Sequence, residues 1–257
     1  MKHPLRTLLL AVCCGLAAAC TQRQERLKLM SYNIRNGIGI DKIQDIGRIA
    51  RVILREAPDL VALQELDSAT LRVDGRYIPG ELGRMTGMHA TFGRAIGFAG
   101  GSYGIGLLSR TEPLAVRSIP LPGREEARVL LMAEFPDYTV CITHLSLTPE
   151  DRLASLPIIR EATDTCRKPV LLAGDFNTGN AAAVLAGLGG GFRILSDTTR
   201  MTFPSDNPAV RIDYILGRGL PTSATVAESA VDHTATASDH CPLWVTLVWK
   251  RGKQPGK

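Results

Sequence analysis

The feature that most constrains this fold is a short apolar run that ends in closely spaced polar residues. Val170-Leu171-Leu172 predicts a short buried strand, and Ala173-Gly174-Asp175-Phe176-Asn177 follows it directly. Side chains two residues apart along an extended segment point the same way, so Asp175 and Asn177 can reach one site. A strand followed by an Asx-type turn explains the same residues without any site.

Five further apolar runs end in, or lead into, a polar residue. One such residue is ordinary at the rim of a sheet, but so many of them indicate strand ends that converge on one site. The residues are Asn33, Glu65, His144, Asp213, and the neighbours Asp239 and His240.

The apolar periodicity predicts an α/β chain in which strands dominate. Helices are expected in two clusters, one in each half, over residues 41–56, 77–88, 148–166 and 180–188. No internal repeat and no linker divides the body of the chain. This pattern favours two packed sheets with helices outside over a regular βαβ alternation. Strands are expected over residues 27–34, 59–66, 88–92, 103–110, 116–121, 129–135, 138–145, 170–172, 211–216, 222–231 and 243–249.

The N-terminus has the character of an export signal. A basic start precedes an apolar run over residues 8–19 that is too short for a typical transmembrane helix. Leu16-Ala17-Ala18-Ala19-Cys20 resembles a bacterial lipoprotein signal, which implies cleavage before Cys20 and lipid on its sulfur. A plain secretory signal cut after Ala19 is the alternative. We therefore expect an exported protein of the bacterial cell envelope, in the periplasm or on the outer surface.

After that signal, the rest of the chain is expected to have three parts. Residues 20–26 are expected to form a polar tether, residues 27–249 one domain, and residues 250–257 a basic disordered tail. The formal net charge is +5, but Lys2 and Arg6 leave with the signal and four positive charges lie in the tail, so the body is near −1. The basic composition therefore does not indicate a nucleic-acid-binding face.

The cysteines of the mature chain form no recognisable framework. Cys141, Cys166 and Cys241 are odd in number and scattered, which excludes a disulfide scaffold and a CxxC metal site. One bridge is compatible with an exported protein, and Cys141–Cys166 is the pair we expect.

The strand-end residues share a coherent chemistry. The carboxylates of Glu65 and Asp239 are hard oxygen ligands of the kind that Mg²⁺ or Mn²⁺ prefers, whereas tetrahedral zinc spacing is absent from the sequence. Histidines can hydrogen-bond or protonate a phosphoryl oxygen, and a second carboxylate can orient them. Asparagines donate neutral hydrogen bonds to phosphate.

Six short motifs occur in a fixed order from about Leu29 to Val248. They are Tyr32-Asn33, Gln64-Glu65, Thr143-His144-Leu145, Gly174-Asp175-Phe176-Asn177, Ile212-Asp213-Tyr214 and Ser238-Asp239-His240. Together they resemble the endonuclease/exonuclease/phosphatase superfamily, which includes nucleases, sphingomyelinases and inositol polyphosphate 5-phosphatases. The resemblance implies a four-layer α/β/β/α sandwich of two packed mixed β-sheets flanked by helices. Tyr32-Asn33-Ile34-Arg35 also looks like exported bacterial members described as metal-dependent hydrolases.

The resemblance also implies roles for these residues. Glu65, with Asp239 and Asn33, would hold a divalent ion. Asp175 would orient or deprotonate the attacking water. His240, oriented by Asp213, would contact the scissile phosphate. The residues expected to bind that phosphate are Asn33, Asn177, His144, His240 and Arg128.

Arg128 and Tyr103 also have an alternative interpretation as ordinary residues of a strand. The expected activity is a metal-dependent phosphodiesterase acting on a lipid headgroup or other small phosphodiester. The alternatives are an extracytoplasmic nuclease, a phosphomonoesterase, and a non-catalytic lipoprotein that binds phosphorylated ligands. We expect a monomer attached to the membrane through its N-terminal lipid.

Overall fold

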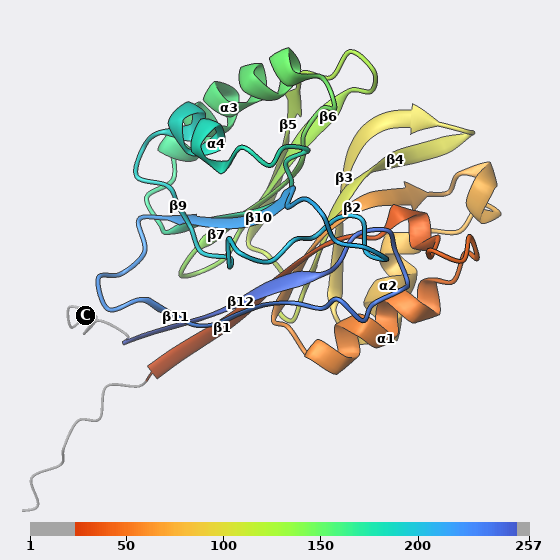
Figure 1. Cartoon of the computed structure of the whole chain (residues 1–257), viewed down its shortest axis with the longest axis horizontal. Coiled ribbons are helices and arrows are strands. Elements are labelled where there is room, and N and C mark those ends of the chain that lie inside the picture. The colour runs from red at the N-terminus through yellow and green to blue at the C-terminus, as the bar shows by residue number, and fades with distance from the viewer. Residues whose placement is uncertain (1–23, 251–257) are drawn as a thin grey trace, which may run out of the picture.

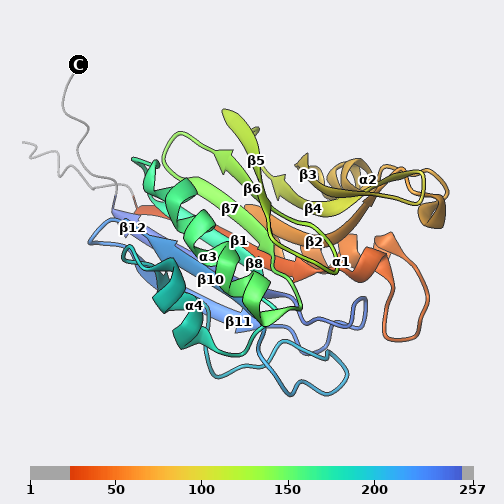
Figure 2. The ribbon, with the colours of Figure 1, turned by 90° about the horizontal axis from the view of Figure 1, so that it is seen from above.

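The structure is a computed structural model that describes residues 24–250. The expected signal over residues 1–19, the expected lipidation site at Cys20 and the tail after Lys250 lie outside the described residues. Two six-stranded sheets pack face to face, and helices cover the outer side of each (Figures 1 and 2). The four-layer sandwich of two mixed sheets is therefore confirmed. Between residues 24 and 250, no helix has the length and apolar character that crossing a membrane requires.

The first sheet has the order β11-β12-β1-β2-β4-β3, in which β1 and β2 run parallel. Its outer face packs against α1 and α2 through one apolar cluster. The bounds are β1 Gln24–Asn33, α1 Ile46–Glu56, β2 Leu60–Ser68, α2 Ile78–Thr86, β3 His89–Phe98, β4 Gly101–Ser109, β11 Thr225–Val231 and β12 Leu243–Lys250, with 3₁₀ turns η1 Arg35–Gly37 and η2 Leu71–Val73.

The second sheet has the order β5-β6-β7-β8-β10-β9, in which β7 and β8 run parallel. Its outer face packs against α3 and α4 through a second cluster. The bounds are β5 Ala115–Leu121, β6 Arg128–Glu134, β7 Thr139–His144, α3 Pro149–Asp164, β8 Val170–Asp175, α4 Ala181–Leu188, β9 Arg193–Ile194 and β10 Asp213–Arg218.

The main core lies between the two sheets. In β1, Leu27 and Leu29 point into this central cluster, whereas Met30 and Tyr32 point outward beneath α1. Because alternate side chains are buried on opposite faces, the strand sequence is apolar almost throughout. The near-continuous apolar runs therefore reflect strands covered on both sides.

Helix α1 begins at Ile46, later than the periodicity predicts. Asp45 caps α1 by accepting a hydrogen bond from the Gly47 amide at 2.7 Å. The preceding residues are used in a turn instead, in which Asp41 accepts from the Ile43 amide at 3.0 Å and pairs with Arg48. These local side-chain contacts compete with the helix and delay its start.

Three expectations are corrected here. The tether is shorter than predicted, because β1 begins at Gln24, which pairs with Lys250 of β12. That pairing also places Lys250 in a strand and not in the tail. The Cys141–Cys166 disulfide is wrong, because both thiols are free. Cys141 is fully buried beneath α3 and packs as a small apolar side chain.

Candidate active site

One half of the site is built on the second sheet, where three strands place polar residues side by side. His144, at the end of β7, lies opposite Asp175 at the end of the parallel strand β8. Asp213 begins the antiparallel strand β10 and also lies opposite Asp175. Gly174 allows this close pairing, because a Cβ there would lie 2.0 Å from the backbone oxygen of Thr143.

The other half comes from the first sheet. Asn33 ends β1, and Glu65 lies at an irregularity in the neighbouring strand β2, where the register shifts between Leu63 and Leu66. Glu65 has a φ of 59°, a left-handed conformation that is uncommon outside glycine. Such backbone conformations concentrate at functional sites, where the surrounding structure holds them in place.

Asn33 joins the two halves. Its side-chain nitrogen donates to Glu65 Oε1 at 3.0 Å and to Asp175 Oδ2 at 3.2 Å. Its side-chain oxygen accepts from the Arg35 amide at 3.1 Å, and its backbone oxygen accepts from the Ser238 hydroxyl at 2.7 Å. Asn33 is fully buried and therefore positions the two carboxylates from behind.

A cavity of about 380 Å³ opens where these elements meet. Asn33 and Asp213 are buried behind its wall. The predicted residues that line it are Glu65, Arg128, His144, Asp175, Asn177, Asp239 and His240, and Tyr103 lines it too. A larger cavity of about 500 Å³, beside β5 and the end of α3, contains none of these residues.

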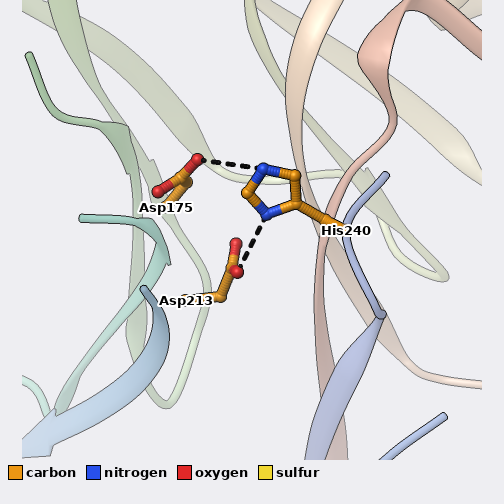
Figure 3. A group of neighbouring side chains, drawn as sticks. All are labelled: Asp175, Asp213 and His240. Atoms are coloured by element: carbon orange, nitrogen blue, oxygen red, sulfur yellow. Dashed lines mark hydrogen bonds and ion pairs between the residues drawn. The ribbon is translucent and has the colours of Figure 1, made fainter. Parts of the chain in front are cut away.

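Asp175 stands at the centre of the site. Its Oδ2 lies 3.6 Å from Nε2 of His144 and 3.6 Å from Nε2 of His240, and its Oδ1 accepts from the Asn177 amide at 2.8 Å. The other ring nitrogen of His240, Nδ1, lies 3.0 Å from Asp213 Oδ2. Figure 3 shows the His240 ring with one nitrogen toward each carboxylate. The Asp213 carboxylate therefore fixes the orientation of the His240 ring.

The two histidines differ in charge. Burial opposes a charged His240, but the carboxylates of Asp213 and Asp175 outweigh it and raise the pKa of His240 to about 10. Burial, Arg128 and His240 all lower the pKa of His144 well below its ordinary range. At neutral pH the site therefore holds one imidazolium and one neutral imidazole.

The environment of Asp175 suits a base at neutral pH. Burial raises the pKa of Asp175, and the Asp213 carboxylate raises it further. The charge of His240 and the hydrogen bonds from Asn177 and Asn33 act in the opposite direction, and the resulting pKa is about 7. A base works best when its pKa lies near the pH at which it operates.

Arg128 and Asn177 are both engaged in hydrogen bonds at the cavity wall. Arg128 Nη1 lies 3.0 Å from Glu126 Oε1 and 3.3 Å from Nδ1 of His144. The side-chain nitrogen of Asn177 donates to the Leu145 carbonyl at 2.8 Å. Contacts from these donors to a phosphate would compete with the hydrogen bonds they make here.

Several lining residues were not predicted. Glu126 lies two residues before Arg128 in the charged loop that precedes β6 and enters the cavity beside Tyr103. Phe203 packs its ring 4.8 Å from that of His240. Leu147 and Ile212 complete the wall. Adjacency to Arg128 was the only sequence signal for Glu126, and the sequence offers none for Phe203.

Two groups of side chains could hold a metal ion. Asp175, Asp213 and His240 offer ligand atoms within 4.8 Å of one another. However, His240 Nδ1 already lies within hydrogen-bonding distance of Asp213 Oδ2, at 3.0 Å, and an ion bound between these residues would have to displace that contact. Asp175, His240 and Asp213 are better explained as a chain of polar contacts that orients the imidazole.

Glu65 and Asp239 fit a hard divalent cation better. Both carboxylates line the cavity, and each is partly exposed. Glu65 is oriented by Asn33 through one oxygen, and Asp239 Oδ2 pairs with Arg35 Nε at 3.3 Å. Oxygen donors that keep a face toward solvent suit Mg²⁺, which usually retains several waters.

Solved structures with the same fold come from several organisms. An endonuclease/exonuclease/phosphatase protein from Beutenbergia cavernae is 23% identical with a TM-score of 0.70, over 88% of this chain and 72% of the other. A mannosyl-6-phosphatase from Bacteroides thetaiotaomicron is 19% identical with a TM-score of 0.69, over 87% and 100%. D. rerio TDP2, complexed with a single-strand DNA product, is 22% identical with a TM-score of 0.65, over 86% and 98%.

No curated protein sequence matches the chain significantly. The family comparison is direct, however, since residues 30–240 match the Endonuclease/Exonuclease/phosphatase family, a span that contains all six motifs. Members of this family are hydrolases that act on phosphoesters. The chain belongs to the endonuclease/exonuclease/phosphatase family.

Proposed function

We propose that the protein is a divalent-metal-dependent phosphodiesterase that cleaves a P–O bond by attack of an activated water. The observation that carries this proposal is the placement of Asp175 between two histidines of different charge, at a cavity that also contains Glu65 and Asp239. A base, a cationic donor, a neutral donor and two carboxylates that can bind a metal ion are the groups that such a reaction needs.

Asp175 would orient and deprotonate the attacking water. Its Oδ1 is held by the Asn177 amide and its Oδ2 by Asn33, so the carboxylate has a defined direction. A pKa of about 7 lets a substantial fraction accept a proton at neutral pH.

His240 and His144 would contact the phosphoryl oxygens from two sides of Asp175. As a cation, His240 offsets negative charge that develops in the transition state, and Asp213 holds it in place. Asn177, at the cavity wall, would contribute a further contact to the phosphate.

Glu65 and Asp239 would hold Mg²⁺ or Mn²⁺, with Asn33 orienting Glu65 from behind. A bound ion would supply Lewis-acid stabilisation of a phosphoryl oxygen. Arg35, which pairs with Asp239 here, would have to release that carboxylate.

We propose a lipid headgroup or another small phosphodiester as the substrate. The cavity volume of about 380 Å³ and the near-neutral charge of the body support a compact substrate. The TDP2 structure with a DNA product makes a nuclease the second candidate, and the mannosyl-6-phosphatase makes a phosphomonoesterase the third. A non-catalytic lipoprotein that binds phosphorylated ligands is the candidate outside the enzymes.

The test compares matched substrates under three metal conditions. The purified full-length chain is incubated with Mg²⁺, Mn²⁺ or EDTA and with plasmid DNA, RNA, sphingomyelin, an inositol phosphate, and nitrophenyl mono- and diesters. We expect EDTA-sensitive cleavage of small diesters with intact plasmid. Nicked plasmid at low enzyme concentration would make the protein a nuclease, monoester cleavage alone would make it a phosphatase, and no hydrolysis of any substrate would favour binding.

The same assay tests the site. His240→Ala is expected to abolish hydrolysis, and His89→Ala, which truncates an exposed histidine on β3, is the matched control. Equal activity of the two variants would show that hydrolysis does not take place at the proposed site.

We also propose that the protein is an exported, monomeric lipoprotein of the bacterial envelope. The proposal rests on the signal-like sequence that ends at Cys20. Cys20→Ser should release the chain from the membrane fraction and prevent labelling with radioactive palmitate, whereas Cys166→Ser should do neither. Soluble, unlabelled wild type would instead support a plain secretory signal.

A further inference from the structure

We infer that Arg128 is a positioning residue that fixes His144 in the tautomer with its proton on Nε2. From the sequence alone, Arg128 is expected only to bind the phosphate. The position of its guanidinium beside the His144 ring supports this additional role. Of the tests below, only the kinetic one rests on the proposed function.

The argument begins with the hydrogens of Arg128 Nη1. A guanidinium has five N–H donors and no acceptor, and Nη1 carries two of them. One is directed at Glu126 Oε1, 3.0 Å away, and the other at Nδ1 of His144, 3.3 Å away. Nδ1 must therefore be the acceptor in this contact, which leaves it without a proton.

Arg128 has little freedom to withdraw from this position. Its side chain is only 6% exposed, and Nη2 contacts Glu125 Oε1 at 3.3 Å. Glu125 is itself held by the segment that follows His144, because it accepts from the Ser146 hydroxyl at 2.7 Å and from the Leu147 amide at 2.7 Å. The loop before β6 and the end of β7 thus hold the guanidinium against the imidazole.

The consequence is an asymmetry between the two histidines. In His240 the inner nitrogen Nδ1 faces a carboxylate, whereas in His144 it faces a cation. A neutral His144 with Nδ1 unprotonated carries its hydrogen on Nε2, which is the atom 3.6 Å from Asp175 Oδ2. His144 therefore presents an N–H donor to the cavity and has no basic lone pair there.

The direct test is the tautomer of His144 in solution. The full-length chain is labelled with ¹⁵N in histidine, and long-range ¹H–¹⁵N correlation spectra at neutral pH distinguish protonated from unprotonated ring nitrogens. His144→Gln identifies the His144 signals. We expect Nδ1 of His144 to be unprotonated and Nε2 to be protonated, without added metal or substrate.

Variants of Arg128 test its part in this preference. Arg128→Met removes the donor and should allow the Nδ1–H form to appear, whereas Arg128→Lys keeps a donor and should restore the wild-type pattern at least in part. The kcat of Arg128→Met should fall by up to about 10²-fold, the loss expected when one preorganised donor is misplaced, with a smaller change in KM. Arg124→Met, at an exposed arginine of the same loop that pairs with Asp151, should leave the spectrum unchanged.

Two results would overturn the inference. One is a protonated Nδ1 on His144 in the wild type, and the other is an unchanged Nε2–H tautomer in Arg128→Met. If Arg128→Met does not fold, the wild-type spectrum decides the question alone. Because the spectra need no turnover, a protein without hydrolase activity would leave this test intact.

Discussion

Asp213 Oδ2 accepts a hydrogen bond from His240 Nδ1 at 3.0 Å, and both residues are almost completely buried. Their pairing joins β10 to the turn before β12, and so links the two sheets at the site. The other oxygen of Asp213, Oδ1, is buried without a hydrogen-bond partner among the described residues. The carboxylate is therefore tied to the fold mainly through His240.

Asp213→Asn should lower kcat by roughly 10²-fold or more, because an amide keeps the shape but loses the charge that stabilises the imidazolium. KM should change less, since Asp213 does not line the cavity. Steady-state kinetics against a small diester measure both values. A loss confined to KM would contradict the role of Asp213 as the residue that orients His240.

Asp175→Asn should lower kcat by about 10²- to 10⁴-fold, the range associated with loss of a general base. The fold should persist, because the new amide oxygen can still accept from the Asn177 amide. Circular dichroism and kinetics give the two readouts. Asp206→Asn, at an exposed loop position, is the control and should behave like wild type. Substantial activity in Asp175→Asn would exclude Asp175 as the base.

Glu65→Gln should weaken Mg²⁺ binding by at least roughly 10- to 100-fold, the loss typical even of outer-shell changes at metal sites. Isothermal titration calorimetry of the metal-free protein measures this without turnover. Glu112→Gln removes an exposed carboxylate elsewhere and should leave the affinity unchanged. Equal Mg²⁺ affinity in wild type and Glu65→Gln would show that Glu65 does not bind the ion.

Glu125 should make the stability of the protein depend on pH in the acid range. Burial alone would raise its pKa, but the hydrogen bonds from Ser146, its own backbone amide and Leu147 outweigh burial and lower the pKa of Glu125 to about 2. Because the folded-state pKa lies below the unfolded value near 4.5, the stabilisation is present above about pH 4.5 and is lost as the pH falls toward 2.

Urea unfolding of wild type and Glu125→Gln across this range checks the prediction. The difference in unfolding free energy should be largest near pH 6 and should shrink as the pH falls through the interval below 4.5. A difference that stays constant with pH would mean that the charge of Glu125 contributes nothing and that only its shape matters.

Gly174→Ala should destabilise the protein by about 1–3 kcal/mol or more, because the new Cβ would meet the backbone oxygen of Thr143 at 2.0 Å. The backbones of Gly174 and Thr143 cannot shift easily, because both lie in hydrogen-bonded strands of one sheet. Gly179→Ala is the matched control, since its Cβ would lie 3.7 Å from the nearest atom, the Arg211 oxygen. Urea midpoints compare the two, and similar values would show that the strand can shift to accept a side chain.

Much of this protein could be predicted from local sequence patterns. The runs that end at Asn33, Glu65, His144 and Asp175 predicted buried strands with polar ends. These residues do end or interrupt strands, two in each sheet, that meet at the candidate site. Such predictions succeed because strand character and side-chain direction depend on near neighbours in the chain.

The sequence by itself therefore determined most of the strands, the chemistry at their ends and the resemblance of six ordered motifs to one family. It did not predict the short strand β9, and it ended β3 too early, at residue 92 and not at Phe98. Only the tertiary structure decided that Asn33 braces two carboxylates from behind the cavity, that Glu126 enters it, and that Arg128 faces Nδ1 of His144. These contacts join residues on different strands and in different sheets. They depend on the register between neighbouring strands, on the left-handed backbone conformation of Glu65 and on the packing of the loop before β6. No local sequence pattern encodes these three features.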